Sequence, residues 1–343
     1  MIRLLGVLSG WLALTSAAPA PSVALNLIVG DTLPPRLSDF RFFVDAAATR
    51  PNARVEPYAL NTALFSDYAE KFRFIYVPPG KKISYTSEGV LDFPVGSALI
   101  KTFGYPADMR VPDKNIRVLE TRLLLRRESG WVALPYVWNA ERTEAVLKRG
   151  GTRLPVSWID AKGARREISY AVPNQNQCKE CHGLAGEVVP IGPKARNLND
   201  GAHLQRLYRT GILDKAPDDA PLLPRWDDPR SGTVALRARA YLDVNCAHCH
   251  NRKGAASNSG LFLAYEEPSA VALGIGKVPV AAGRGSGGLA LDIAPGHPEQ
   301  SILLYRMKST EPGIAMPELG RATVHDEAIV LLGDWISRMP TTH

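Results

Sequence analysis

The chain has 343 residues, of which 45% are hydrophobic, so it can form about two or three globular domains with buried cores. The formal net charge is +7, yet no basic run is interleaved with aromatic residues, which excludes the usual pattern of a nucleic-acid-binding surface. No stretch after the N-terminus reaches about 18 apolar residues, so the remaining sequence contains no typical membrane span.

The first 24 residues have the layout of a secretory signal peptide. Arg3 supplies a short positive region, Leu4–Leu14 an apolar core, and small residues follow, with possible cleavage after Ala18 or Ala24. The apolar run is short for a membrane span, and an uncleaved anchor is the alternative. We therefore expect a mature periplasmic protein that is not stably inserted in a membrane.

A mostly β domain is expected over residues 25–215. Short apolar runs alternate with turns rich in Gly, Pro and Asp, as in antiparallel sheets. The expected strands are Lys71–Tyr76, Ala98–Phe103, Ile116–Arg126, Trp131–Trp138, Leu154–Ile159 and Arg166–Tyr170. Thr143–Lys148 is expected to form a short helix. These patterns predict an antiparallel sandwich or a curled sheet.

The first chemical motif, Cys178-Lys179-Glu180-Cys181-His182, follows this β region. Two thiols at this spacing can each add to a vinyl group of one haem, and the next residue, a histidine, then becomes the proximal ligand of the iron. After the motif the sequence becomes helical, because Ala202–Thr210 has apolar residues on one face and is followed by Gly211. The Pro-rich segment 216–232 is predicted to be a linker.

The same motif returns as Cys246-Ala247-His248-Cys249-His250, within a second domain predicted over residues 233–343. A helix from Val234 to Asn245 leads into this motif, and a closing helix from Asp326 to Arg338 repeats apolar residues at helical spacing. This layout predicts an all-α cytochrome c domain. The expected fold class is therefore α+β, with an antiparallel β domain that ends in one haem motif and a C-terminal all-α domain that carries the other.

The two motifs contain all four cysteines of the chain. Zinc ribbons also use Cys-x-x-Cys pairs, but their second pair usually follows after about 15–20 residues, far closer than Cys246 follows Cys181. A disulfide or a redox dithiol would not explain a histidine directly after both motifs. We expect two covalently bound haem c groups, held by Cys178, Cys181, Cys246 and Cys249, with zinc or disulfides as the alternatives. Covalent haem attachment after export agrees with the predicted signal peptide.

The predicted iron ligands are His182, His250 and Met316. Met316 lies in the run Ala315-Met316-Pro317-Glu318, downstream of the second motif, where it would be the sixth ligand of the second haem. A thioether opposite an imidazole favours reduced iron and raises the reduction potential. The alternative for Met316 is a residue that fills a gap in a core.

A sixth ligand for the first haem is not evident. Between the two motifs there is no methionine, and the one histidine, His203, is expected to be a polar residue near the start of a helix, with a role as sixth ligand of the first haem as the alternative. Lys101 is expected to be an ordinary exposed strand residue, with an unusual ligand role as the alternative. We therefore predict that His182 alone holds this iron and that the β domain covers the opposite side with apolar side chains.

Several runs of residues carry a family resemblance. They are Leu64-Phe65-Ser66-Asp67-Tyr68-Ala69, Phe93-Pro94-Val95-Gly96 with Lys101-Thr102-Phe103, Glu120-Thr121-Arg122-Leu123-Leu124, and Asn245-Cys246-Ala247-His248-Cys249-His250-Asn251. They resemble a family of uncharacterised bacterial two-haem c-type cytochromes over nearly the whole mature chain. The resemblance implies haem binding and electron transfer, without a particular substrate. A less specific likeness, over about Ala59 to Gly183, is to the β domain of the cytochrome P460 family, whose haem has an open side against a sheet.

Two classes of function fit these features. The first is electron transfer between redox partner proteins, unidentified here, through two haems. The second is a haem enzyme, in which an open first haem reacts with peroxide or an oxidised nitrogen species and the second haem relays electrons. Electron transfer is the main expectation, because an open site is not by itself a reaction. No catalytic residue is assigned.

Overall fold

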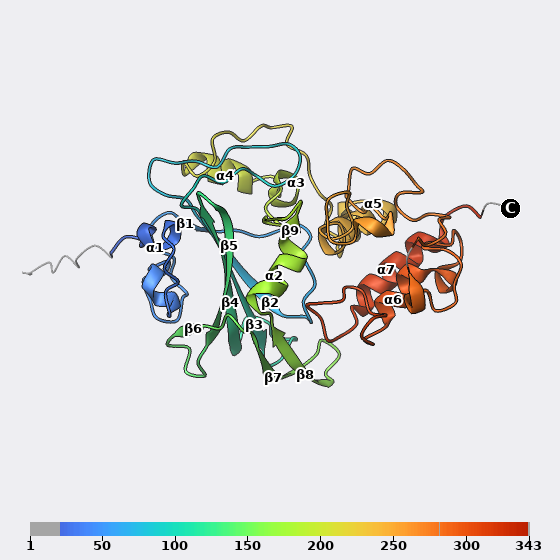
Figure 1. Ribbon diagram of the computed structural model, residues 1–343, viewed down its shortest axis with the longest axis horizontal. Helices are drawn as coiled ribbons and strands as arrows, with labels where there is room; N and C mark the ends of the chain where they lie inside the picture. The colour runs from blue at the N-terminus through green and yellow to red at the C-terminus, as the bar shows by residue number, and fades with distance from the viewer. Residues whose placement is uncertain (1–20, 281, 342–343) are drawn as a thin grey trace, which may run out of the picture.

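The computed structural model describes residues 21–280 and 282–341. Most of the predicted signal peptide therefore lies outside the described residues. A six-stranded antiparallel sheet dominates the described part of the chain, and short helices are scattered around it (Figure 1).

The sheet has its strands in sequence order, each antiparallel to the next. The strands are β1 (Val55–Pro57), β2 (Glu70–Tyr76), β3 (Ala98–Pro106), β4 (Ile116–Arg127), β5 (Gly130–Trp138) and β6 (Ala145–Leu147). The four strands predicted from alternating apolar runs in this region are confirmed, and β4 and β5 form the expected hairpin. The short helix predicted over Thr143–Lys148 is wrong, because Ala145–Leu147 pairs with β5 as an edge strand.

Different segments of the chain pack on the two faces of the sheet. The N-terminal segment, with α1 (Leu25–Val29) and the 3-10 helix η1 (Leu37–Phe40), packs on one face through Ile28, Phe40 and Phe42. The other face carries the hairpin of β7 (Thr152–Ile159) and β8 (Arg165–Val172) at one end. At its other end this face packs against α3 (Ala195–Leu198) and α4 (His203–Arg209). The contacts with the β7–β8 hairpin and with α3 and α4 form two apolar clusters on this face. The part of the sheet between them lies beside α2 (Gln175–His182) and the strand pair β9 (Gly183–Leu184) and β10 (Glu187–Val188).

The predicted all-α C-terminal cytochrome c domain is wrong. The predicted helices are present as α5 (Val234–Asn245) and α7 (Asp326–Ser337), and α6 (Ile302–Lys308) lies between them, but turns and irregular chain make up most of the rest. Four further 3-10 turns occur at η2 (Pro229–Ser231), η3 (Ser257–Ser259), η4 (Gly283–Ser286) and η5 (Pro298–Gln300). Many glycines here adopt positive φ, which interrupts helices. They include Gly260, Gly274, Gly276, Gly296, Gly313 and Gly320.

The C-terminal segment packs directly against the β region. Asp67 Oδ1 accepts hydrogen bonds from the backbone N–H of Ala322 and Thr323 at 2.7 and 2.8 Å. The segment 216–232, predicted to be a linker, is also anchored, because Leu223 is fully buried and Thr62 Oγ1 donates to the Pro224 carbonyl at 2.7 Å. These contacts hold the second motif against the region that carries the first.

Candidate haem-attachment site

The first motif forms the end of helix α2. Asn174 caps this helix, because its side chain accepts a hydrogen bond from Gln177 N while the Gln177 side chain accepts one from Asn174 N. Cys178 is buried, and Cys181 and His182 are half-buried at the C-terminal end. The motif is therefore presented on one turn and a half of regular helix beside the sheet.

One hydrogen bond fixes the ring of His182. Its Nδ1 lies 2.8 Å from the carbonyl oxygen of Val189, which can only accept, so Nδ1 carries the proton. Burial lowers the pKa of His182 to about 4, and the charge of Lys101 lowers it further, so the ring is neutral at pH 7. Nε2 then holds a lone pair, which is the tautomer that a metal ligand needs.

The second motif follows α5, which Thr233 caps by accepting from Leu236 N. His250 Nδ1 lies 3.1 Å from Ser259 Oγ. The Ser259 hydroxyl donates its one proton to the Ala256 carbonyl at 2.6 Å, so it accepts from His250 Nδ1. Burial lowers the pKa of His250 to about 4, and Arg306 and His248 act in the same direction. His250 is thus a second neutral ring with its lone pair on Nε2.

The two motifs meet in space, although they are far apart in the sequence. Cys181 and Cys249 lie close enough to shift each other's pKa, which is lowered at Cys181 and raised at Cys249. His248 also lowers the pKa of Cys181, and the Cys249 thiol donates to the Glu180 carbonyl at 3.7 Å. All four cysteines are free. The structure therefore brings six of the seven predicted attachment and ligand residues, all except Met316, into two adjoining groups.

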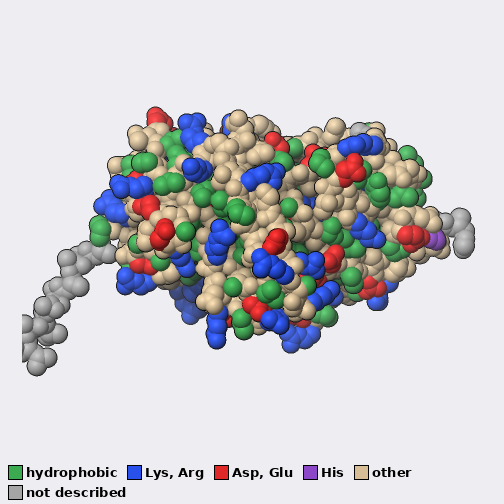
Figure 2. All heavy atoms as spheres, turned by 90° about the horizontal axis from the view of Figure 1, so that it is seen from below, with side chains coloured by type: hydrophobic (Ala, Val, Ile, Leu, Met, Phe, Trp, Pro, Cys, Tyr) green, Lys and Arg blue, Asp and Glu red, His purple; other side chains and the backbone are tan. Residues whose placement is uncertain are grey.

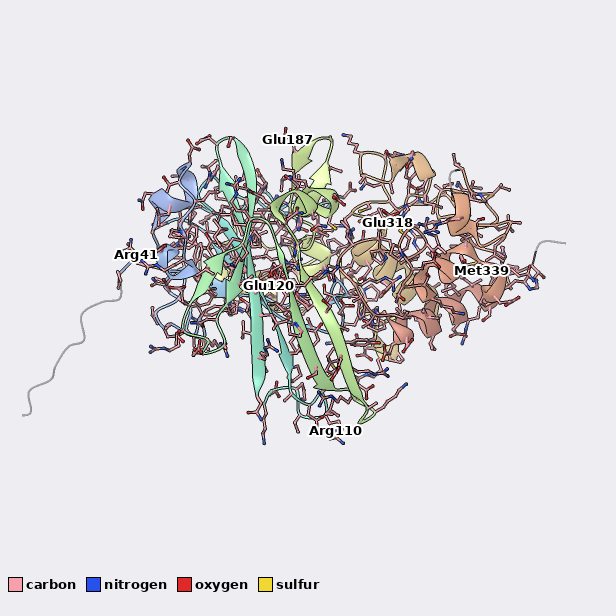
Figure 3. The ribbon with its side chains drawn as sticks, turned by 60° about the horizontal axis from the view of Figure 1, so that its bottom comes forward. Arg41, Arg110, Glu120, Glu187, Glu318 and Met339 are labelled. Atoms are coloured by element: carbon pink, nitrogen blue, oxygen red, sulfur yellow. The ribbon has the colours of Figure 1, made fainter. Side chains whose placement is uncertain are left out.

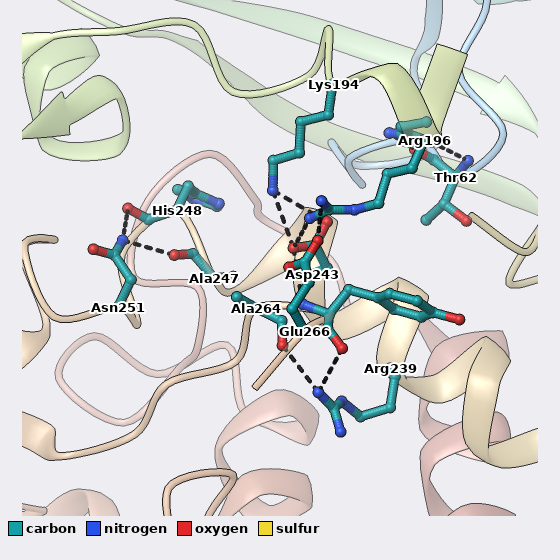
Figure 4. Close-up of polar contacts among 12 residues, drawn as sticks. Thr62, Lys194, Arg196, Arg239, Asp243, Ala247, His248, Asn251, Ala264 and Glu266 are labelled. Atoms are coloured by element: carbon teal, nitrogen blue, oxygen red, sulfur yellow. Dashed lines mark hydrogen bonds and ion pairs between the residues drawn. The ribbon is translucent and has the colours of Figure 1, made fainter. Parts of the chain in front are cut away.

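Buried ion pairs hold the two helices of this region together (Figure 4). Arg196 of α3 and Lys194 bind the carboxylate of Asp243 in α5 at 2.9 and 3.0 Å, and the Asp243 side chain has no exposed surface. Arg196 also pairs with Glu266, which follows the second motif. Because these charges lie far from water, their pairing fixes α5, and with it the second motif, against the β region.

Met316 lies in the loop between α6 and α7. Its N–H donates to the Arg306 carbonyl at 3.1 Å, and its side chain is half-buried. Arg306 in turn influences the pKa of His250, and Glu318 influences that of Cys249, so the loop lies beside the second motif. No hydrogen bond joins Met316 to His250 among the described residues.

The two other candidate ligands of the first haem occupy different places. His203 begins α4 as predicted, but it is 3% exposed, and burial lowers its pKa to about 4, with Arg206 as the next cause. Its charged neighbours, Arg206 and Asp200, do not belong to either motif. Lys101 is instead a neighbour of His182 and is half-buried, so the expectation of an ordinary exposed residue is wrong.

The sheet beside the first motif is charged, whereas we expected apolar side chains. Four basic residues of β2, β3 and β4, which we name the cationic strip, lie between the two apolar clusters of this face. They are Lys71, Arg73, Lys101 and Arg122. Sequence reasoning missed the strip, although charges at every second position of predicted central strands were a visible signal.

The donor set of each motif can be compared with what haem c attachment requires. Among the residues that the structure describes, no three His, Cys, Asp or Glu side chains form a cluster that could hold a metal ion. Two free thiols and one neutral histidine with an available Nε2 are present in each motif, as haem c attachment requires. The residues present therefore fit two haem c groups.

Comparison with known proteins gives no match. No family model, no curated protein and no solved structure is significantly similar to this chain.

Proposed function

We propose that the chain is a diheme c-type cytochrome that passes electrons between redox partner proteins. The observation that carries the proposal is the meeting of two Cys-x-x-Cys-His motifs at Cys181 and Cys249, with both motif histidines fixed as neutral rings. Two redox groups attached at adjoining points can exchange electrons within one chain. Each haem, when bound, would supply an iron that cycles between its ferric and ferrous forms.

The chain's own residues have three tasks in this proposal. Cys178 and Cys181 attach one group, and Cys246 and Cys249 the other. Val189 and Ser259 hold the proximal histidines in the tautomer that leaves Nε2 free. Met316 is proposed as the sixth ligand at His250, where its thioether would favour the reduced iron.

Export to the periplasm belongs to the same proposal. Val23 and Ala24 are buried in the core, and Asn52 Nδ2 donates to the Pro21 carbonyl at 2.8 Å. Because the packed chain begins before residue 24, these contacts favour cleavage after Ala18 over cleavage after Ala24.

Partner binding follows from the surface. Lys and Arg side chains are spread over the face in Figure 2, with acidic side chains among them, so this face presents mixed charge. We propose a redox protein as the partner, without nucleic-acid binding. No helix in the described ranges is long and apolar enough to cross a membrane.

Reductive titration of the purified protein tests this function. The holoprotein should take up two electrons per chain, with the absorption bands of a low-potential and a high-potential haem c appearing in turn. The variant Cys246→Ala/Cys249→Ala should take up one. A wild-type protein that carries haem but takes up no electrons from a reductant would contradict the proposal.

A haem enzyme is the second candidate, because the cationic strip lies beside the first motif and no second ligand is evident there. Binding of carbon monoxide to the reduced protein distinguishes the haem enzyme from the electron-transfer protein. An open first haem should bind about one carbon monoxide per two haems after reduction, and His203→Ala should leave this uptake unchanged. If the wild type binds none and His203→Ala gains binding, His203 is a ligand and simple electron transfer is favoured.

A further inference from the structure

The cationic strip has like charges directly opposite one another. Arg73 of β2 pairs in register with Lys101 of β3, and Lys101 pairs with Arg122 of β4, so three basic side chains face each other across three adjacent strands. Burial, with Arg122 and Arg73 as the next causes, lowers the pKa of Lys101 to about 7. Lys71, two residues before Arg73, points to the same face. Like charges at directly opposed positions destabilise a sheet, and side chains this close need a counter-charge.

Among the described residues, one carboxylate, that of Glu120, forms an ion pair with the strip, while Glu70 and Asp67 act on Lys71 without forming one. Glu120 binds Arg122 through both oxygens at 3.0 and 2.5 Å and also accepts from Tyr170 at 2.6 Å, so it is fully engaged. Figure 3 places Glu120 in the body of the molecule, whereas Arg110 lies at the outer edge. Lys71 and Arg73 donate to backbone carbonyls of Ala69 and Lys71.

Lys101 has the fewest polar partners of the four residues in the cationic strip. Within the described ranges its Nζ makes no hydrogen bond or ion pair, and its nearest partner is the ring of Phe103, 5.1 Å from Nζ to the centroid. Arg122 also lies over this ring at 4.3 Å. The two cations therefore share one aromatic face, which supplies much less than a carboxylate would.

The cationic strip lies between apolar side chains, which makes unbalanced positive charge there unfavourable in free energy. Leu99 and Leu124 lie in the apolar cluster on one side of the strip, and Phe103 and Val137 in the cluster on the other. In such surroundings repulsion between like charges is stronger than in water. Arg122 nevertheless keeps 27% of its side chain exposed, so the strip remains accessible.

We infer that the cationic strip binds a small anion of the carboxylate or oxyanion class beside the attachment point of the first haem. The inference rests on the proposed function, because it names the ligand class of that site. A propionate of the first haem and a free anion have the same chemistry. The strip's neighbours in the motif are Cys178 and His182, which would attach a vinyl group and ligate the iron, whereas the propionates of a haem lie on the edge away from its vinyl groups. A free anion is therefore the assigned occupant.

Isothermal titration calorimetry with nitrite tests this inference on the holoprotein at low ionic strength. The wild type should bind about one nitrite per chain. Lys101→Gln should weaken binding at least about tenfold, because a hydrogen bond to a charged group is lost. Arg73→Gln should act in the same direction. Lys162→Gln is the matched control, since it makes the same charge change in the exposed turn between β7 and β8 and should leave affinity unchanged.

Haem content, measured on the same samples by pyridine haemochrome, separates the possible failures. Two haems without nitrite binding would overturn the inference and leave the proposed function intact, whereas a protein without haem would overturn the function. Binding that appears only in Cys178→Ala/Cys181→Ala would show that a propionate normally fills the strip, which overturns the free-anion assignment. If Lys162→Gln weakened nitrite binding as much as Lys101→Gln does, the loss would come from the change in net charge alone, and the inference would be overturned.

Discussion

The imidazoles of His182 and His250 are each defined by a single acceptor at Nδ1. For His182 the acceptor is a backbone carbonyl, and for His250 it is the hydroxyl of Ser259. Such a bond orients the ring and makes Nε2 a stronger electron donor to a metal. The Cys-x-x-Cys-His pattern identifies the two rings from the sequence, but their Nδ1 partners come from contacts made after folding and could not be predicted.

Ser259→Ala removes the acceptor of His250. The ring should then donate less electron density, so the reduction potential of the second haem should rise while the first stays unchanged. Spectroelectrochemical titration measures both potentials. Ser257→Ala, a matched change at an exposed position of the same 3-10 turn, is the control. Equal potentials in Ser259→Ala and the wild type would show that this hydrogen bond does not act on the iron.

Met316→Ala tests the proposed sixth ligand. Loss of the thioether should remove the Met-to-iron band near the red edge of the visible spectrum and lower one of the two potentials, since a thioether favours ferrous iron. Met109→Ala, in a loop of the β region, should change neither the band nor the potentials. A Met316→Ala protein that keeps both would rule this residue out.

At the scale of elements, the junction between the two motifs depends on buried polar groups. Asp243 of α5 holds Arg196 of α3 and also Lys194, and it accepts from Tyr265 N. The helices α5 and α7 and most of the strands were predictable, because their apolar periodicity is strong. Their assembly into an all-α domain was wrongly predicted, because periodicity reveals helices but does not reveal the irregular, glycine-rich chain between them.

Asp243→Asn should lower the free energy of unfolding by about 3–5 kcal/mol, because it leaves two buried cations with one partner fewer. Urea unfolding followed by tryptophan fluorescence provides the measurement. Asp227→Asn breaks an exposed pair with Arg225, 3.4 Å apart, and should cost less than about 1 kcal/mol. Similar losses in the two variants would mean that the buried pairs do not hold the junction.

His325 gives the junction a dependence on pH. It occupies the N-cap position of α7, but its side chain makes no cap hydrogen bond. Instead its ring stacks on Phe65, with centroids 4.1 Å apart, and Nδ1 lies 3.0 Å from the Tyr241 hydroxyl. Burial lowers the pKa of His325 to about 4, although Glu327 acts in the opposite direction. As the pH falls from about 6.5 to about 4, the unfolded chain binds a proton that the folded ring does not, so stability decreases.

His325→Phe should abolish this contribution, which amounts to about 3 kcal/mol over that pH range. Urea unfolding at pH 7 and pH 4 should therefore show a smaller loss of stability in the variant than in the wild type. His297→Phe changes an exposed histidine and should keep the wild-type dependence. If both variants lose stability with pH as the wild type does, His325 is not the responsible group.

At the scale of the whole molecule, the two Cys-x-x-Cys-His motifs lie where the region of the β-sheet meets the irregular C-terminal segment (Figure 1). The motifs themselves could be read from the sequence, since their chemistry depends on local spacing. Their contact through Cys181 and Cys249 could not, because it depends on how Asp67, Tyr68 and Asp243 join segments that are distant in the sequence. The cationic strip was missed although the alternating charges are visible within single strands, because their meeting depends on register across three strands.

The intact mass of the protein, made in a host that exports and matures c-type cytochromes, tests the central claim most directly. We predict a chain that begins after Ala18 and carries two haems, with one haem in Cys178→Ala/Cys181→Ala and one in Cys246→Ala/Cys249→Ala. A wild-type mass with fewer than two haems would contradict the account.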